Sequence, residues 1–215
     1  SNCFLNWMHL FIPNEQIKNP KEGLDKINLI NERLLNKQNH KILEEYLSLK
    51  LLYKVFKKLF FLIRIVSKIN INDVQKIFAY KGSDLSFYFI EDFYEDFIGF
   101  ESFKNLMWLE LLKEYFKNLP NQKIGFYLCE ELPWEKALIY HWKENNHGPL
   151  IAVPHGFNLR YWDIYYFKNI KDLINTKSNL PLPDKYIANN EAFYNELLEY
   201  YPKEKIEKLE FLSCL

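Results

Sequence analysis

The segment from residue 124 to 156, "IGFYLCEELPWEKALIYHWKENNHGPLIAVPHG", constrains the fold more than any other part of the chain. A short apolar run leads into a segment that opens with Pro133 and closes at Gly148, and a second apolar run follows. Proline suits the first turn of a helix, and glycine suits the position just past its end. The pattern predicts strand, helix and strand, a crossover that usually joins parallel strands with a right-handed turn.

The remainder of the chain repeats this alternation. "DKYIANN" (184–190) predicts a third strand, "EAFYNELLEYY" (191–201) a helix, and "EKIEKLEFL" (204–212) a fourth strand. Strands that alternate with helices indicate an α/β fold with a parallel sheet. We therefore expect residues 121–215 to form a Rossmann-like α/β region.

Residues 1–120 follow a different pattern and are expected to be mostly α-helical. The opening "CFLNWMHLFIP" (3–13) is short, apolar and closed by proline, which favours a strand. Between Pro20 and about Asn70 the apolar residues recur at helical spacing, which predicts two helices. The first half is therefore a large helical portion beside the α/β region.

Two further helices are expected in this first half. Asn72 and Asp73 suit the start of one helix, which would end near Gly82, and the segment 101–120 returns to helical period before Pro120. Between them, residues 83–100 are rich in aromatic and acidic side chains.

The second helix after Pro20 carries basic residues beside its apolar stripe: Lys50, Lys54, Lys57, Lys58, Arg64 and Lys68. A basic amphipathic helix can lie on an anionic membrane surface. Surface helices of soluble domains also carry lysine routinely, and this solvated face is the favoured interpretation. Peripheral membrane contact stays open as the second one.

Charge and composition exclude several classes of function. The 28 basic and 28 acidic residues cancel, which disfavours a nucleic-acid partner. The three cysteines are far apart and predict neither a disulfide framework nor a zinc motif, so a cytoplasmic location is expected. The longest strongly apolar run, 59–66, contains Arg64 and is too short to span a bilayer, so no transmembrane segment is predicted. No G-x-G-x-x-G, P-loop or G-x-S-x-G motif occurs in the chain.

Candidate catalytic residues follow the two predicted strands of the crossover. Glu130 and Glu131 come after the first strand, and His155 and Gly156 come after the second. Ligands of doubly wound folds gather at the carboxyl ends of parallel strands, where a carboxylate and an imidazole suit general-base catalysis. Equally, an acid here can cap the following helix and His155 can bond a loop carbonyl.

The other polar candidates give weaker signals. His9, His40, His141 and His147 show no ligand spacing to each other, His141 is expected to pack within its helix, and no metal site is predicted. The run "FNLRYWDIYYF" (157–167) sets Arg160 and Asp163 among aromatic residues. Aromatic faces beside polar groups suit sugar rings, and they suit an ordinary packed surface about as well.

Five stretches together resemble bacterial surface carbohydrate biosynthesis proteins, which are similar to GT-B-type glycosyltransferases. These are "YLCEELPWEKAL", "IAVPHG", "LRYWDIYYF", "LPLPDKYIANNEAF" and "YPKEKIEKLEFL". The resemblance covers about the last hundred residues, while "NWMHLF" and residues 80–100 match loosely. It implies that this chain is the acceptor-binding part of such an enzyme and that most of a donor domain follows it. The segment alone is then expected to be inactive.

The resemblance also implies roles for the candidate residues. Glu130, Glu131 or His155 would act as the base on an acceptor hydroxyl, and the substrate-binding candidates are Glu135, Gly156, Arg160 and Asp163. The donor would be a nucleotide sugar, no metal would be bound, and the acceptor would be a glycan or a lipid-linked sugar of lipopolysaccharide or capsule synthesis at the inner face of the membrane. A polyol-phosphate transferase of the same fold and a non-catalytic scaffold are the alternatives.

Overall fold

The computed structural model describes residues 4–15, 17–33, 37–130, 132–154 and 181–209. The chain divides into two compact units, Ser1–Tyr115 and Phe116–Leu215. The boundary falls inside the long helix α5 (Phe100–Asn118), five residues before the boundary expected from the change of sequence pattern. Each unit is a mixture of helices and parallel strands, which confirms an α/β fold.

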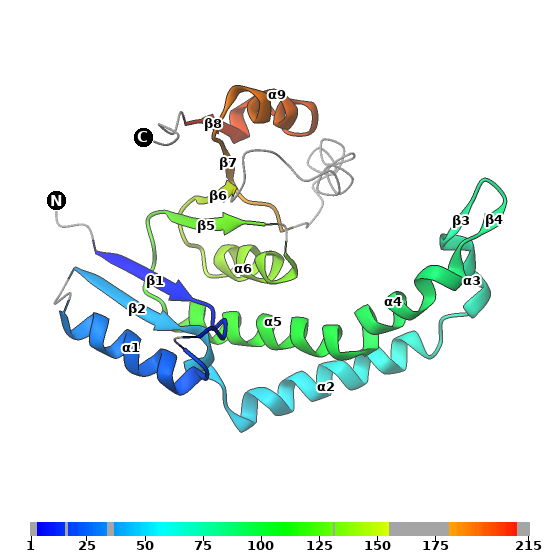
Figure 1. Cartoon of the computed structure of the whole chain (residues 1–215), viewed down its shortest axis with the longest axis horizontal. Coiled ribbons are helices and arrows are strands. Elements are labelled where there is room, and N and C mark those ends of the chain that lie inside the picture. Colours follow the sequence, from blue (N-terminus) through cyan, green and yellow to red (C-terminus); the bar gives the residue numbers. More distant parts are fainter. Residues whose placement is uncertain (1–3, 16, 34–36, 131, 155–180, 210–215) are drawn as a thin grey trace. The chain divides into compact units, whose positions relative to one another are not determined.

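The first unit begins with a strand–helix–strand crossover (Figure 1). Strand β1 (Leu5–His9) is followed by α1 (Pro20–Arg33) and β2 (Gln38–Ile42), and the two strands pair in parallel. Strand β1 was expected, whereas β2 lies within the region predicted to form two continuous helices. That prediction was wrong here because Leu43 and Tyr46, which continue the helical spacing, belong to a single 3₁₀ turn, Leu43–Tyr46, after β2.

Asn31 of α1 protects the free edge of β2. Its side chain accepts the backbone N–H of His40 at 2.8 Å and donates to the backbone carbonyl of the same residue at 2.8 Å. An amide side chain thus supplies both hydrogen bonds that a neighbouring strand would make, which closes an edge otherwise open to pairing.

Helix α2 (Leu49–Val66) begins at Ser48, whose hydroxyl accepts the N–H of Leu51. Helix α3 (Ile71–Ile77) is capped by Asn70 and ends before Gly82, so the expected helix is shorter than predicted. Strands β3 (Ala79–Tyr80) and β4 (Ser83–Asp84) form a hairpin after it.

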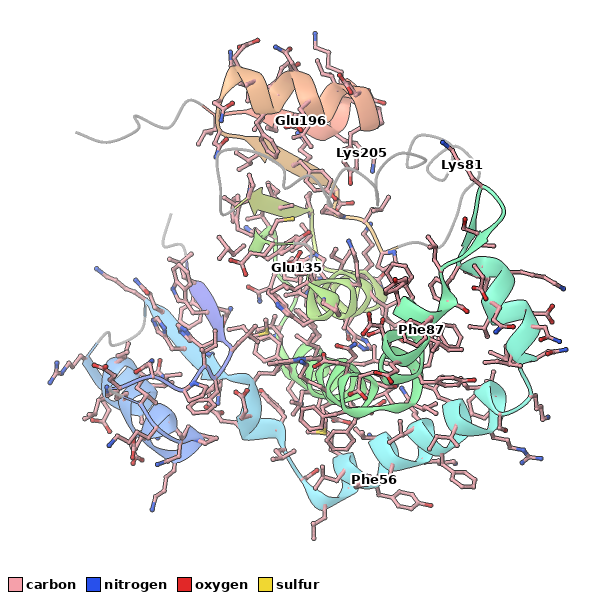
Figure 2. The ribbon with its side chains drawn as sticks, turned by 45° about the vertical axis from the view of Figure 1, so that its right-hand side comes forward. Phe56, Lys81, Phe87, Glu135, Glu196 and Lys205 are labelled. Atoms are coloured by element: carbon pink, nitrogen blue, oxygen red, sulfur yellow. The ribbon has the colours of Figure 1, made fainter. Side chains whose placement is uncertain are left out.

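The hairpin turn consists of Lys81 and Gly82, and Lys81 marks its tip (Figure 2). Both residues have positive φ, 49° and 82°, as a two-residue turn between antiparallel strands requires. Gly82 therefore serves the hairpin turn and not the end of a helix.

Helices α4 (Ser86–Ile98) and α5 (Phe100–Asn118) run back alongside α2 (Figure 1). Lys54 and Lys58 of α2 bind two acids of α5: Lys54 Nζ lies 2.7 Å from Glu114 Oε1, and Lys58 Nζ lies 2.6 Å from Glu110 Oε1. The carboxylate of Glu110 is almost fully buried, so these lysines compensate its charge. The helices of the first unit are thereby joined by ion pairs as well as by apolar contacts.

The second unit contains a four-stranded parallel sheet with the sequential order β5-β6-β7-β8. Strands β5 (Gly125–Cys129) and β6 (Leu150–Pro154) flank α6 (Pro133–Glu144), while β7 (Lys185–Ala188) and β8 (Ile206–Lys208) flank α9 (Glu191–Tyr200) and a short 3₁₀ helix, η2 (Lys203–Lys205). The four strands and the two α-helices were predicted from the sequence, whereas η2 was not. The crossover and the parallel pairing are confirmed.

Helices α6 and α9 cover the same face of this sheet. A Cβ on Gly125 would lie 2.4 Å from the ring of Trp142, so α6 sits directly on β5 at that point. The hydroxyl of Tyr201 donates to that of Tyr186 at 2.9 Å, beyond the end of α9. Right-handed crossovers between strands added in one direction place their helices on one face, which explains this arrangement.

The opposite face of β5 carries Phe126 and Leu128, which are 61% and 47% exposed. Strands of parallel sheets are usually buried on both sides, whereas this face of β5 is open among the described residues. Elsewhere the side chains buried in this unit come from the covered face and from the helices: Tyr127, Leu138, Ile139, Leu150, Ala152, Phe193 and Leu197.

In the described part of the chain, no helix is both long enough and apolar enough to cross a membrane.

Candidate functional site

The candidate site lies at the carboxyl edge of the β5–β8 sheet. Gly125 pairs with Leu150 at the start of β5 and β6, and Cys129 pairs with Pro154 at their end. The two strands therefore end level with each other, and the next residues along the chain are Glu130 and His155. The predicted parallel neighbours are present, and their ends are in register.

Most of the predicted site residues lie outside the described residues. These are Glu131, His155, Gly156, Arg160 and Asp163. Glu130 and Glu135 are described, and they belong to the same turn between β5 and α6.

Glu135 organises this turn from within. Its side chain is fully buried at the third position of α6, and Oε1 accepts the backbone N–H of Glu130 at 2.7 Å and that of Leu132 at 3.1 Å. Figure 2 shows Glu135 within the region of α6. We expected Glu135 to bind substrate, which stays a prediction; in the described structure its Oε1 is engaged by the backbone of this turn. It holds Glu130 in place and does not open to solvent.

This use of Glu135 has a clear electrostatic reason. A carboxylate at the third helical position can accept the N–H of the N-cap residue, here Leu132, and its charge matches the positive end of the helix dipole. The alternative we expected was that Glu130 or Glu131 caps the helix, whereas the carboxylate that accepts the N–H of Leu132 at the start of α6 is that of Glu135. Glu130 is partly exposed at the end of the strand.

Strands β7 and β8 end at the same edge as β5 and β6. Asn190 follows β7 and caps α9, because its Oδ1 accepts the N–H of Phe193 at 2.8 Å, and its Nδ2 donates to Asn189 at 3.0 Å. Lys208, the last residue of β8, forms an ion pair with Glu191 at the start of α9. Sequence reasoning did not select these residues, although the same strand-end rule that selected Glu130 would have found them.

The sheet lacks one feature of doubly wound folds. Its four described strands follow each other in sequence order, so the order does not reverse among them. A reversal opens a crevice for ligands in such folds. The candidate site therefore rests on the level strand ends and on the turn held by Glu135.

An open hollow of about 480 Å³ lies at the opposite, amino edge of the sheet. Its lining comes from the end of α6, the loop before β6 and the residue before β7: Trp142, Lys143, Asn146, His147, Gly148, Pro149 and Asp184. The polar groups here maintain the loops. Asp184 Oδ2 accepts the N–H of Leu150 at 2.9 Å, and Lys143 Nζ donates to the carbonyl of Leu182 and lies 3.8 Å from Asp184.

The pKa of Lys143 lies below that of an ordinary lysine. Burial is the largest cause, the charge of Asp184 raises the pKa, and the charge of Lys205 lowers it. Because Asp184 and the carbonyl of Leu182 already engage the ammonium group, we assign this hollow a structural role.

His141 and His147 pack within the second unit. His141 is buried, in agreement with the packing role expected for it. Its Nδ1 lies 2.8 Å from Glu144 Oε2. His147 Nδ1 accepts the N–H of Gln122 at 3.1 Å, and its ring lies 4.7 Å from that of Trp142. Burial lowers the pKa of His147.

His9 and His40 are brought together by the pairing of β1 and β2. His9 Nε2 and His40 Nδ1 are 2.8 Å apart, with ring planes within 14° of each other and centroids 5.1 Å apart, so the rings meet edge to edge. Gln38 Oε1 accepts from Trp7 Nε1 at 2.9 Å and lies 3.2 Å from His40 Nε2. Because Gln38 Oε1 can only accept a hydrogen bond, His40 carries its proton on Nε2. The Nδ1 of His40 is then the acceptor, and His9 donates to it from its own Nε2.

This histidine pair was not recognised from the sequence. The two residues stand 31 positions apart, and their contact depends on the register of two strands of which one was missed. Burial, and secondarily the charge of His40, lower the pKa of His9. Among the described residues, no cluster of three or more histidine, cysteine or acidic side chains could hold a metal ion.

Comparison of the chain with protein-family models, with curated proteins and with solved structures gave no match in any of the three.

Proposed function

We propose that this chain is the acceptor-binding part of a GT-B-type glycosyltransferase that builds a bacterial surface carbohydrate. The single observation that carries the proposal is the level ending of β5 and β6, where Cys129 pairs with Pro154. A carboxylate, Glu130, follows one strand and an imidazole, His155, follows the other. Such a pair at the carboxyl edge of a parallel sheet suits the removal of a proton from a bound hydroxyl.

The proposed reaction transfers a sugar from a nucleotide sugar to a glycan or lipid-linked acceptor. The acceptor oxygen attacks the anomeric carbon, the bond from that carbon to the nucleotide's phosphate oxygen breaks, and the nucleotide leaves with the bonding electrons. Glu130, Glu131 or His155 takes the proton of the attacking hydroxyl. Gly156, Arg160 and Asp163 are the proposed contacts to the sugar rings.

The turn held by Glu135 supports this assignment. A general base contributes only when its position relative to the attacking hydroxyl is fixed. The hydrogen bond from Glu130 N to Glu135 Oε1, at 2.7 Å, fixes the backbone of Glu130 against the start of α6. We assign Glu135 as a positioning residue, because its carboxylate meets the backbone of this turn and lies away from solvent.

The test is a transfer assay on the protein encoded by the complete gene. The donors are a panel of nucleotide sugars together with a CDP-linked polyol phosphate, and the acceptors are lipid-linked glycans extracted from the host. Glu130→Gln, Glu131→Gln and His155→Ala are compared with Glu204→Gln. Glu204 is an exposed acid before β8, at the amino edge of the sheet, and serves as the matched control.

We expect wild type and Glu204→Gln to transfer a sugar at equal rates. At least one of the Glu130→Gln, Glu131→Gln and His155→Ala variants should lose about a hundredfold or more in kcat, which is the usual contribution of a general base to the rate. If only the polyol phosphate is transferred, the protein is a polyol-phosphate transferase and not a glycosyltransferase. Full activity in all three of these variants would refute the proposed site.

A further inference from the structure

The outer face of α2 carries a continuous apolar stripe. Five large apolar residues recur at alternating spacings of four and three, which places them along one side of the helix. Their exposed fractions are Leu49 85%, Tyr53 70%, Phe56 56%, Phe60 70% and Ile63 40%. Phe56 extends from α2 in Figure 2.

Most of this stripe lies outside the face that α2 uses to fold, and only the ring of Phe56 also packs on α5, where its centroid is 5.5 Å from that of Phe103. Leu51, Val55 and Val66 are the buried residues of the helix, and none of them belongs to the stripe. Lys54 and Lys58 bind the acids of α5 at the margin of that buried face. The first unit thus packs α2 through one face and leaves a second apolar face uncovered among the described residues.

Three exposed cations stand beside the stripe. Lys50, Lys57 and Arg64 are spaced by seven residues, which keeps them on one flank of the helix. No ion pair involves them in the described structure, and the segment from Leu49 to Val66 contains five basic residues and no acidic one. The flank therefore presents a uniform positive charge next to aromatic rings.

This combination identifies the chemistry of the partner. Aromatic and leucine side chains enter the boundary between headgroups and acyl chains, while neighbouring lysine and arginine side chains reach back to lipid phosphates. A second copy of this face would meet the first with like charges and no acid to balance them, which opposes self-association. Because α2 is not apolar enough to cross a bilayer, it would lie in the plane of the surface.

We propose that the outer face of α2 docks the protein on an anionic lipid surface. Leu49, Tyr53 and Phe60 supply the inserted side chains, and Lys50, Lys57 and Arg64 bind the headgroups. This proposal concerns the first unit and does not depend on the transferase reaction. It selects the lipid-bound state from the two interpretations that the sequence left open for this helix.

The test is flotation of the protein with vesicles of neutral phosphatidylcholine or of phosphatidylcholine with one third phosphatidylglycerol, in 0.1 M and 0.5 M salt. Lys50→Gln, Lys57→Gln and Arg64→Gln are combined in one variant. Its control combines Lys21→Gln, Lys113→Gln and Lys117→Gln, three exposed lysines on other helices. Tyr53→Ser with Phe60→Ser is compared with Ile12→Ser plus Ile124→Ser, two exposed isoleucines elsewhere.

We expect wild type and both controls to float with the anionic vesicles and to be released by 0.5 M salt. The charge variant should bind roughly a hundredfold more weakly, since each cation near the surface contributes about a fivefold factor. The Tyr53 and Phe60 variant should not float, and its circular dichroism should match wild type. Equal binding to neutral vesicles, absence of wild-type binding, or unchanged binding of both test variants would overturn the proposal. So would a wild-type dimer that the Tyr53 and Phe60 changes dissociate.

Discussion

The carboxylate of Glu135 accepts the backbone N–H of Glu130 across the turn between β5 and α6, at 2.7 Å. The contact joins the end of a strand to the first turn of the following helix through a fully buried side chain. One predicted site residue, Glu135, thus fixes the backbone of another, Glu130. The contact also predicts an effect on stability that does not depend on any substrate.

Glu135→Ala should lower the free energy of unfolding of the second unit by about 1–3 kcal/mol, because two backbone N–H groups lose their acceptor inside the turn. Glu135→Gln keeps one carbonyl oxygen and should cost less. Urea unfolding followed by tryptophan fluorescence measures both. Glu199→Ala, at an exposed acid of α9, is the control. Equal stability of wild type and Glu135→Ala would show that the turn does not need this carboxylate.

Gly148→Ala should destabilise the second unit by about 1–3 kcal/mol, the usual range for forcing extra atoms into a filled space. A Cβ at this position would lie 2.0 Å from the backbone carbonyl oxygen of Lys123, which cannot move as a side chain can. Gly82→Asn is the matched control, since Gly82 has open space around it and asparagine tolerates its positive φ of 82°. Thermal unfolding compares them, and an unshifted melting temperature for Gly148→Ala would contradict the close packing.

The pKa of His9 should lie below the usual imidazole value of about 6.5, because burial and then the charge of His40 oppose protonation. The unfolded chain then binds more protons than the folded one just below this pH. The first unit should therefore be most stable above pH 6.5 and lose stability as the pH falls through the window below it.

NMR titration of the His9 ring measures this pKa directly. His40→Asn keeps a polar partner but removes the neighbouring charge, so it should raise the pKa of His9 part of the way back. A His9 pKa above 6.5 in wild type would show that burial and the charge of His40 do not dominate at this ring.

The second unit was predictable because its sequence signals agree with each other. Apolar runs of strand length alternate with a helix that begins at Pro133 and ends before Gly148, and the strands and crossover appear where expected. Strand β2 was not predictable in the same way. Its sequence, "QNHKI", is polar, and Leu43 continues the helical spacing of the segment around it.

The candidate site was predictable only to the level of strand ends. The rule that ligands gather at the carboxyl edge of parallel strands selected Glu130, which ends up there. The role of Glu135 was not predictable from its spacing alone, because a carboxylate five residues after Glu130 can face solvent or turn back to the chain. The His9 and His40 contact required a strand register that local sequence does not contain.

We propose that Glu130 and His155 share one edge of the sheet, and a disulfide cross-link between the two positions would detect this. The variant replaces Cys3, Cys129 and Cys214 by serine and introduces Glu130→Cys with His155→Cys. A control variant introduces Glu130→Cys with Glu204→Cys, because Glu204 lies at the amino edge, before β8. Neighbouring strands are about 4.8 Å apart, within the reach of a disulfide, whereas the control pair is separated by three strand spacings.

Mild oxidation followed by mass spectrometry of the digested protein reads out the result. We predict a disulfide between positions 130 and 155 and none between positions 130 and 204. Failure of the first pair to link under conditions that oxidise both thiols, or equal linking of both pairs, would contradict the shared site.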